Sequence, residues 1–504
     1  MQAEVAMASG ESVVRLGGDL RERDLWRAPK NRDEAVSAYG RAEALRLELE
    51  RKLPLSDQTS DDRHRVGATL EDKLKNSMFV RAHRGKAAAV AGFIDANKRL
   101  LRARDAARGT VLSTACAKGH LDIVRDLLNR GADVRVHDKD RNTLLHEVSS
   151  SGSSEIAQLL VQCGLKLNAK NADGSTPVQL ASFNGHFALA QMLLRAGADP
   201  NIADEAGCAA LHFACQGPDP RLVTLLFDHN ANPSAEDNEG ATPLSVACAY
   251  GRVDCARALV TRGVDLNWQD KIRGFTPVHY ACGNNQYEAL RYLDSESARL
   301  DIASITGRTP LSVAAQRGHV QIIHYLLERN ARADAADEDG VTPIMYACEH
   351  GNTDCVERLI QGGASLAAHD VIGRTPLSRA AAEGHLQIVD LLLNEKAGVD
   401  AADEDGCTPL MYACVSGNVD CAERLIQGGA GLETRESKGS TPLMHACDQD
   451  HVSVVACLLE AGANPNNGDP NAGSPLDLAR GSPEIVKLLR AAGALSTNPK
   501  DSDS

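Results

Sequence analysis

One short phrase recurs along this chain of 504 residues at a spacing of 33, broken once by 34. A fixed period in this range indicates one supersecondary unit stacked on copies of itself, because a single unit cannot bury its own apolar face. The period therefore predicts a solenoid. The fuller copies begin Thr-Pro at Thr176, Thr242, Thr276, Thr309, Thr342, Thr375, Thr408 and Thr441, and weaker copies begin at Thr110, Thr143, Ala209 and Ser474.

The signals inside each unit follow a constant order, as in the copy that begins at Thr309. Proline suits the first helical turn, and a threonine before it can cap the exposed N–H groups. This first helix runs through small residues and ends near Gly318. A second helix then has apolar residues at helical spacing, which predicts one buried face. Those residues are Ile322, Ile323, Leu326 and Leu327.

The pattern resembles the ankyrin repeat, in which Asp and Gly precede Thr-Pro-Leu-His, Ala-Ala, Gly-His, a Leu-Leu pair and Gly-Ala-Asp. The resemblance covers roughly residues 105–495. It implies a mainly α fold, an ankyrin-repeat solenoid of stacked helix pairs joined by β-hairpin loops, with a concave face of hairpin tips and first helices. The mid-repeat glycine is replaced at four positions, where we expect local variants of the turn. These are Pro218, Asn285, Asp450 and Pro483.

Four segments are expected along the chain. Residues 1–70 contain one amphipathic helix and a polar linker, residues 71–104 a degenerate capping repeat, residues 105–495 the solenoid and residues 496–504 a disordered tail. The helix either covers the apolar face of the first repeat or recruits something else, since terminal repeats need a covered face. Its predicted apolar face consists of Val36, Tyr39, Ala42, Leu45 and Leu49.

Composition excludes several classes of function. The net charge of −14 disfavours nonspecific binding to nucleic acid. No run of about 18 apolar residues occurs, so membrane insertion is not expected. Residues 1–10 have no basic cluster followed by an apolar core, which argues against a secretory signal. We expect a cytoplasmic protein, with the nucleus as the alternative compartment.

The 14 cysteines could indicate a metal site or disulfides, but their positions favour packing. Repetition at one slot of the unit is typical of a small buried hydrophobic residue. A pair such as His212 and Cys215 has ligand-like spacing, yet each repeat offers only two of the four ligands that tetrahedral zinc needs. We expect unpaired thiols, no metal and no other cofactor. Seven cysteines lie six residues after the repeat's first residue, at Cys116, Cys215, Cys248, Cys282, Cys348, Cys414 and Cys447.

The sequence contains no recognisable catalytic motif. A Gly-x-Ser-x-Gly elbow, a phosphate loop, a dinucleotide-binding glycine fingerprint and a His-Glu-x-x-His helix are all missing. His146, His212 and His279 stand at the histidine of the Thr-Pro-Leu-His phrase. There the resemblance implies that the ring forms hydrogen bonds across the turn. We therefore predict a protein that is not an enzyme and has no catalytic residues.

Aromatic residues recur four positions after the threonine in every second repeat. The resemblance places this position in the concave groove, and large aromatic side chains on a surface often dominate binding energy. A packing role is the alternative, because residues 337–366 match residues 403–432 at 23 of 30 positions and the spacing can come from duplication. The predicted partner-binding aromatic residues are Phe213, Tyr280, Tyr346 and Tyr412, with Phe183 and Tyr250 nearby.

Acidic residues gather at the predicted hairpin tips. A row of charges of one sign steers oppositely charged partners, so basic or extended protein segments are the expected ligands. The alternative is that these acids only keep a long solenoid soluble. The predicted acidic tip residues are Asp337, Glu338, Asp339, Asp403, Glu404 and Asp405.

These observations predict a non-enzymatic adaptor or scaffold that binds partner proteins through the concave face and hairpin tips. The alternative is a substrate-recruiting subunit of a larger enzyme complex such as a ubiquitin ligase, with residues 1–70 as the contact to the enzyme. Partner identity and oligomeric state stay open, because one scaffold serves many functions.

Overall fold

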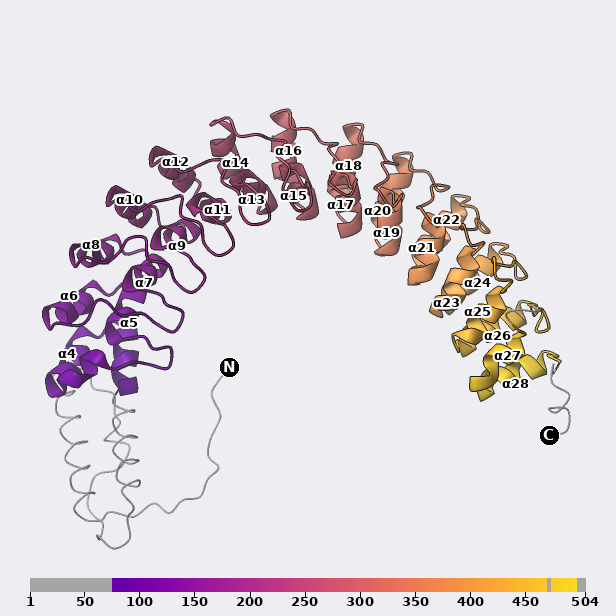
Figure 1. Ribbon diagram of the computed structural model, residues 1–504, viewed down its shortest axis with the longest axis horizontal. Coiled ribbons are helices and arrows are strands. Elements are labelled where there is room, and N and C mark those ends of the chain that lie inside the picture. Colours follow the sequence, from indigo (N-terminus) through magenta and orange to yellow (C-terminus); the bar gives the residue numbers. More distant parts are fainter. Residues whose placement is uncertain (1–74, 469–472, 496–504) are drawn as a thin grey trace, which may run out of the picture. The chain divides into compact units, whose positions relative to one another are not determined.

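The computed structural model describes residues 75–468 and 473–495. Internal contacts divide the chain into two compact units, one ending at Glu205 and one beginning at Ala206. Both units repeat a pair of short helices, and within each unit the first helices form one layer and the second helices another (Figure 1). The predicted segments 1–70 and 496–504 lie outside the described residues.

The described part of the first unit begins with helical residues 75–83. In the region expected to be a capping repeat, Ala82 is fully buried and Gly85 has a φ of +69°. The first helices α5, α7 and α9 pack in sequence, and α4, α6, α8 and α10 pack beside them. The elements are α4 (Ala87–Ala96), η1 (Lys98–Arg102), α5 (Val111–Ala117), α6 (Leu121–Asn129), α7 (Leu144–Ser151), α8 (Ser154–Gln162), α9 (Pro177–Phe183) and α10 (Phe187–Arg195).

The second unit continues the same alternation, and each first helix packs on the next. Its first helices are α11 (Ala210–Gln216), α13 (Pro243–Ala249), α15 (Pro277–Gly283), α17 (Pro310–Arg317), α19 (Pro343–Glu349), α21 (Pro376–Glu383), α23 (Pro409–Ser416), α25 (Pro442–Asp448) and α27 (Pro475–Leu478). Its second helices are α12 (Arg221–Asp228), α14 (Val253–Val260), α16 (Tyr287–Ser295), α18 (Val320–Glu328), α20 (Thr353–Gln361), α22 (Leu386–Asn394), α24 (Val419–Gln427), α26 (Val452–Glu460) and α28 (Pro483–Ala491), with η2 (Ala479–Gly481) before the last.

The first helices begin where the Thr-Pro phrase predicts. Thr309 is the N-cap of α17, its hydroxyl accepts a hydrogen bond from the N–H of Ser312 at 3.3 Å, and Pro310 is the first helical residue. Ala314 and Ala315 are fully buried, as small residues must be where helices of neighbouring repeats approach closely. The helix start and the repeat packing therefore come from the same short phrase.

The mid-repeat turns need a left-handed residue, which glycine usually supplies. Asn285 and Asp450 adopt φ values of +58° and +61° at this place, because their short polar side chains tolerate that conformation. Where proline replaces glycine, the turn is rebuilt. At the first of these sites, Pro218, the proline two residues later, Pro220, is the N-cap of α12. At the second site, Pro483 is itself the first residue of α28.

The loops between repeats are tight turns. In one of them the N–H of Asp337 donates to the carbonyl of Val341 at 3.1 Å, and the N–H of Gly340 donates to Asp337 at 3.0 Å. Such a turn resembles the end of a β-hairpin, but its two arms are too short to form a ladder of paired residues. Over residues 75–468 and 473–495, the structure has no strand, and two isolated antiparallel bridges join pairs of these residues, Arg104 with Thr110 and His137 with Thr143.

Candidate protein-interaction surface

Three tyrosines of the second unit project from equivalent positions of α15, α19 and α23. Tyr280, Tyr346 and Tyr412 are each half-buried, so part of every ring faces solvent. Each is the fourth residue of a helix that begins at the proline of its Thr-Pro pair. We call these three residues the tyrosine row.

A carboxylate of the preceding turn holds each hydroxyl group of the tyrosine row. Tyr346 and Tyr412 donate to Oδ2 of Asp337 and Asp403, both at 2.6 Å, and Tyr280 donates to Oδ2 of Asp270 at 2.9 Å. Burial and the bond to Asp337 raise the pKa of Tyr346 to about 12, so its hydroxyl keeps its proton at neutral pH. These bonds fix the ring orientation and join the turn to the first helix.

An arginine replaces tyrosine in one intervening repeat. Arg379 is buried in α21 and donates from Nη2 to Oδ2 of Asp370 at 2.7 Å, while its Nη1 forms an ion pair with Glu349. Burial alone would raise the pKa of Asp370, but hydrogen bonds from Arg379 and Arg374 outweigh it and lower this pKa. The turn carboxylate therefore has a donor in this repeat too.

The other predicted aromatic residues have different surroundings. Phe213 is half-buried on α11. Tyr250 follows α13, and its exposed fraction is 53%. Phe183 lies in the first unit, and its exposed fraction is 46%. The structure thus brings three of the six aromatic residues into one repeated arrangement and leaves Tyr250 and Phe183 at exposed helix ends.

The six predicted acidic tip residues divide into two groups. Asp337 and Asp403 cap their own turns, because Oδ1 of each accepts the N–H four residues later, at 2.8 and 2.7 Å. The other four side chains are exposed and form no ion pair with any described residue. This exposed set consists of Glu338, Asp339, Glu404 and Asp405.

Successive tips are bonded to one another through the backbone. The N–H of Glu338 donates to Thr306 at 3.0 Å, that of Val371 to Asp339 at 2.9 Å and that of Glu404 to Ile372 at 3.0 Å. The glycine of each tip allows this approach. A Cβ on Gly340, which has a φ of +75°, would lie 3.0 Å from the Cα of Asp370.

Apolar tips alternate with the acidic ones, a feature that the sequence analysis missed. Ile305 and Val371 each have an exposed fraction of 56%, and Ile372 one of 46%. Comparing the two residues after each tip's first residue would have revealed them. We call the whole set the tip edge. It consists of Ile305, Glu338, Asp339, Val371, Ile372, Glu404 and Asp405.

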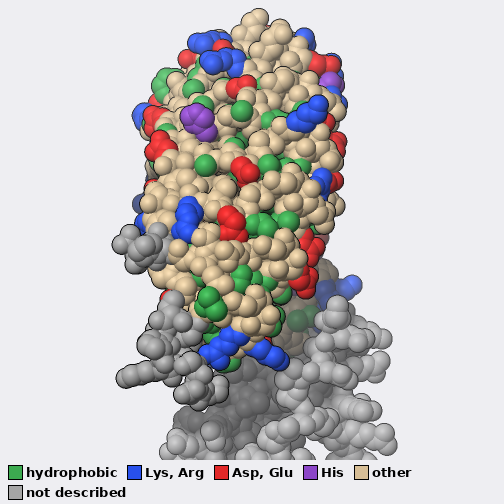
Figure 2. All heavy atoms as spheres, turned by 90° about the vertical axis from the view of Figure 1, so that its right-hand side faces the viewer, with side chains coloured by type: hydrophobic (Ala, Val, Ile, Leu, Met, Phe, Trp, Pro, Cys, Tyr) green, Lys and Arg blue, Asp and Glu red, His purple; other side chains and the backbone are tan. Residues whose placement is uncertain are grey.

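The face turned toward the viewer in Figure 2 lacks such an ordered pattern, since charged and hydrophobic side chains are interspersed on it. Scattered apolar residues are normal on a protein surface and need no functional explanation.

The repeated histidines form hydrogen bonds within and between repeats. Nδ1 of His279 lies 3.1 Å from the N–H of Thr276, and its Nε2 lies 3.1 Å from the carbonyl oxygen of Arg308 in the next repeat. Burial lowers the pKa of His279 to about 4, so the ring is neutral at pH 7. His146 and His212 make equivalent pairs of contacts.

The seven cysteines of the repeated slot are buried free thiols. Burial raises the pKa of Cys348, and of its equivalents, above the usual range of a thiol, which makes them unreactive at neutral pH. Within the described parts of the chain, no three His, Cys, Asp or Glu side chains are arranged to hold a metal ion. The same parts contain no helix with the length and apolar character needed to cross a membrane.

Comparison with known proteins agrees with this architecture. A family model described as ankyrin repeats (3 copies) matches seven overlapping stretches between residues 86 and 501. No curated protein matches the sequence significantly. Among solved structures, the human ASB11 ankyrin repeat domain is 28% identical, covers 44% of this chain and 100% of its own, and has a TM-score of 0.41. Ankyrin repeats are generally protein-interaction modules and typically non-enzymatic. Because the family model matches most of its length, this chain belongs to the ankyrin-repeat family.

Proposed function

We propose that this chain is a non-enzymatic adaptor that binds partner proteins at the tip edge and the tyrosine row of its second unit. The observation that carries the proposal is the alternation of exposed, unpaired carboxylates with exposed apolar side chains on turns bonded to one another. An adaptor needs a preformed surface of this kind, because little conformational entropy is then lost on binding.

The partner that fits is an extended segment in which basic residues alternate with apolar ones. Lysine or arginine would pair with Glu338, Asp339, Glu404 and Asp405, while an apolar residue between them would cover Val371 and Ile372. Charge complementarity of this kind raises the association rate and suppresses partners of the wrong sign. The tyrosine row would add aromatic contact area with fixed ring orientations.

The test is a quantitative affinity purification from the native cell with a tip variant that neutralises the four exposed acids, E338Q/D339N/E404Q/D405N. Asp337 and Asp403 are retained, so the turn caps and tyrosine bonds stay intact. We expect specific partners to be lost at physiological salt and the melting temperature to stay unchanged.

A matched control neutralises four exposed acids on the second helices of the same two repeats, as D354N/E357Q/D420N/E423Q. It changes the net charge equally, so it separates position from overall charge. If partners still bind the tip variant but no longer bind the control variant, the proposed docking site is wrong. Partners that remain on both would show that charge at these repeats has no part in binding.

A further inference from the structure

A side-chain hydrogen bond joins many neighbouring repeats at the loop that follows the second helix. Oδ1 of Asp334 accepts the N–H of Ser365 at 2.8 Å, and Oδ1 of Asp400 accepts the N–H of Gly431 at 3.0 Å. In the first unit, Oδ1 of Asn168 accepts the N–H of Asp199 at 3.0 Å. Each acceptor precedes its donor by 31 residues. We call this bond the junction clamp.

The junction clamp is absent between α6 and α8, where Arg135 stands at the acceptor position. A guanidinium group has only donors, so it cannot accept the N–H of Lys166, which lies 31 residues later. That N–H has no acceptor among the described residues. Two cationic side chains thus occur where the clamp would otherwise form.

A second local bond is missing at the same junction. In other repeats, the side chain at the position of Lys166 accepts the N–H two residues later, as Asp199 does from Asn201 at 2.9 Å. Lysine has no acceptor, and the N–H of Asn168 is without one among the described residues. The junction therefore contains two backbone donors without acceptors beside two side chains that are also donors only.

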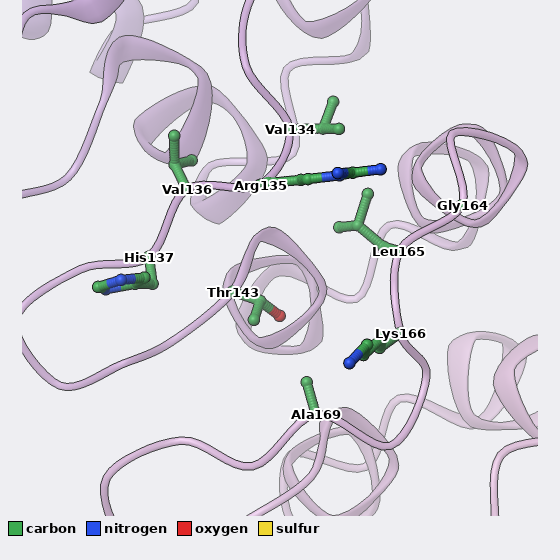
Figure 3. Close-up of a pocket in the computed structure, with 9 residues that line it drawn as sticks. All are labelled: Val134, Arg135, Val136, His137, Thr143, Gly164, Leu165, Lys166 and Ala169. Atoms are coloured by element: carbon green, nitrogen blue, oxygen red, sulfur yellow. The ribbon is translucent and has the colours of Figure 1, made fainter.

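These groups border a cavity of about 430 Å³. Figure 3 shows Arg135 and Lys166 reaching from two different loops, with Arg135 extending toward the loop that contains Leu165. None of the residues that line the cavity is acidic. Its apolar walls are formed by Val134, Val136, Leu165 and Ala169, and its other lining residues are His137, Thr143 and Gly164.

The second unit has an equivalent cavity with different charges. It measures about 370 Å³ and lies at another junction without a clamp, since the N–H of Arg332 has no acceptor among the described residues. Asp301 corresponds to Arg135 there, Arg332 to Lys166 and Asp334 to Asn168. A cavity is thus present at equivalent junctions of the two units. In the cavity of the first unit the charged lining residues are both cationic, whereas the cavity of the second unit also has two aspartates.

We propose that the cavity at Arg135 and Lys166 binds the carboxylate of an acidic peptide segment. The carboxylate oxygens would accept hydrogen bonds from the backbone N–H of Lys166 and from the Arg135 guanidinium, whose planar donors match a carboxylate. The ligand takes the place that an aspartate or asparagine side chain of the protein occupies at clamped junctions. This site is independent of the tip edge and selects the opposite charge.

The apolar walls and the cavity volume favour a peptide over a lone anion. A glutamate side chain fills only part of 430 Å³, and a neighbouring apolar residue would cover Val134 and Leu165. Pockets lined mainly by apolar groups with a few converging polar donors are typical of such ligands. The expected ligand is therefore an acidic residue flanked by leucine or a similar side chain.

The test uses the full chain labelled with ¹⁵N-lysine and two probes, acetyl-Leu-Glu-Leu-amide and its glutamine counterpart, at about 50 mM salt to limit screening. We expect the amide signal of Lys166 to shift saturably with the glutamate peptide, and the glutamine peptide to bind at least about tenfold more weakly. An equal response to both peptides, or no shift, would overturn the proposal.

Two variants separate the site from general charge and from folding. R135N restores an acceptor for the N–H of Lys166, so its melting temperature should not fall, and the Lys166 signal should no longer respond to the peptide. R332D changes a cation in the equivalent cavity and should leave the response unchanged. Inorganic phosphate is the competing anion, and tighter binding of phosphate than of the glutamate peptide would show that the carboxylate assignment is wrong.

Discussion

The hydroxyl group of Tyr346 joins the tip turn to the first helix of its repeat through Asp337. Removing it in Y346F leaves the ring in place but takes a donor from a half-buried carboxylate. We expect the free energy of unfolding to fall by about 1 kcal/mol, since this is the usual net value of such a bond. Urea unfolding measures the change.

Tyr250 provides the matched control for Y346F. Its side chain is more than half exposed and its hydroxyl has no hydrogen-bond partner among the described residues. Y250F should therefore leave the unfolding midpoint unchanged. An equal loss in both variants would mean that the bond to Asp337 does not stabilise the repeat.

Gly340 and Gly363 illustrate two different reasons why a position favours glycine, a positive φ and a close contact with a neighbouring tip. Both have positive φ, of +75° and +87°, but a Cβ would meet the next tip only at Gly340. We expect G363A to cost about 1 kcal/mol of unfolding free energy through its backbone conformation, and G340A to cost roughly 1 kcal/mol more through the contact with Asp370. Equal losses in urea unfolding would contradict the close stacking of tips.

At the scale of the helix pair, the histidine ring of the Thr-Pro phrase links one repeat to the next. The pKa of His279 is lowered from about 6.5 to about 4, so folding favours the neutral ring. This contribution is complete above pH 6.5 and is lost as the pH falls toward 4, because the unfolded chain then binds a proton that the folded chain does not. The protection factors of the α15 amides, which correct for the intrinsic slowing of hydrogen exchange at low pH, should therefore decrease over this range.

Gln179 shows that a side chain that does not titrate can bond both its own cap residue and a carbonyl of the following loop. In its repeat, Oε1 accepts the N–H of Thr176 at 2.5 Å and Nε2 donates to the carbonyl of Ile202 at 2.9 Å. H279Q should therefore retain the junction at pH 7, and the protection factors of α15 should no longer decrease between pH 6.5 and 4. If the α15 protection factors of this variant still decrease between pH 6.5 and 4, another group is responsible.

The helix pairs could be predicted from the sequence because the period, the Thr-Pro caps and the apolar stripes act locally. Asn285 and Asp450 could be predicted only as variant turns, since their left-handed conformation depends on the helices they join. The Tyr346 to Asp337 bond requires the tip to fold back over the helix. Such geometry is not visible in a residue pattern, although the same nine-residue spacing recurs at Tyr412 and Asp403.

At the scale of the whole molecule, contacts between successive repeats dominate, so a local change should affect mainly its neighbours. We expect G340A to raise hydrogen exchange in α17, α19 and α21, which surround its tip, and to leave exchange in α5, α7 and α9 unchanged. Uniform acceleration in all six helices would show that the chain unfolds as a single cooperative unit.

The candidate site was only partly predictable at this scale. The exposed acids at Glu338 and Glu404 follow from composition and position, whereas Asp337 and Asp403 belong to the same acidic runs but cap their turns. The cavity at Arg135 lies at a junction without the clamp that several other junctions have. Recognising it required knowing which backbone N–H each side chain reaches.

The close backbone contact between tips also has an evolutionary consequence. In three successive repeats, glycine, the turn carboxylate and the backbone bonds hold the tip in one conformation, and two adjacent exposed positions form no side-chain hydrogen bond with any described residue. These pairs are Glu338 with Asp339, Val371 with Ile372, and Glu404 with Asp405. Mutations at these pairs can accumulate without a stability penalty. A duplicated block of two repeats can therefore acquire a new binding preference by as few as two substitutions while its fold stays the same.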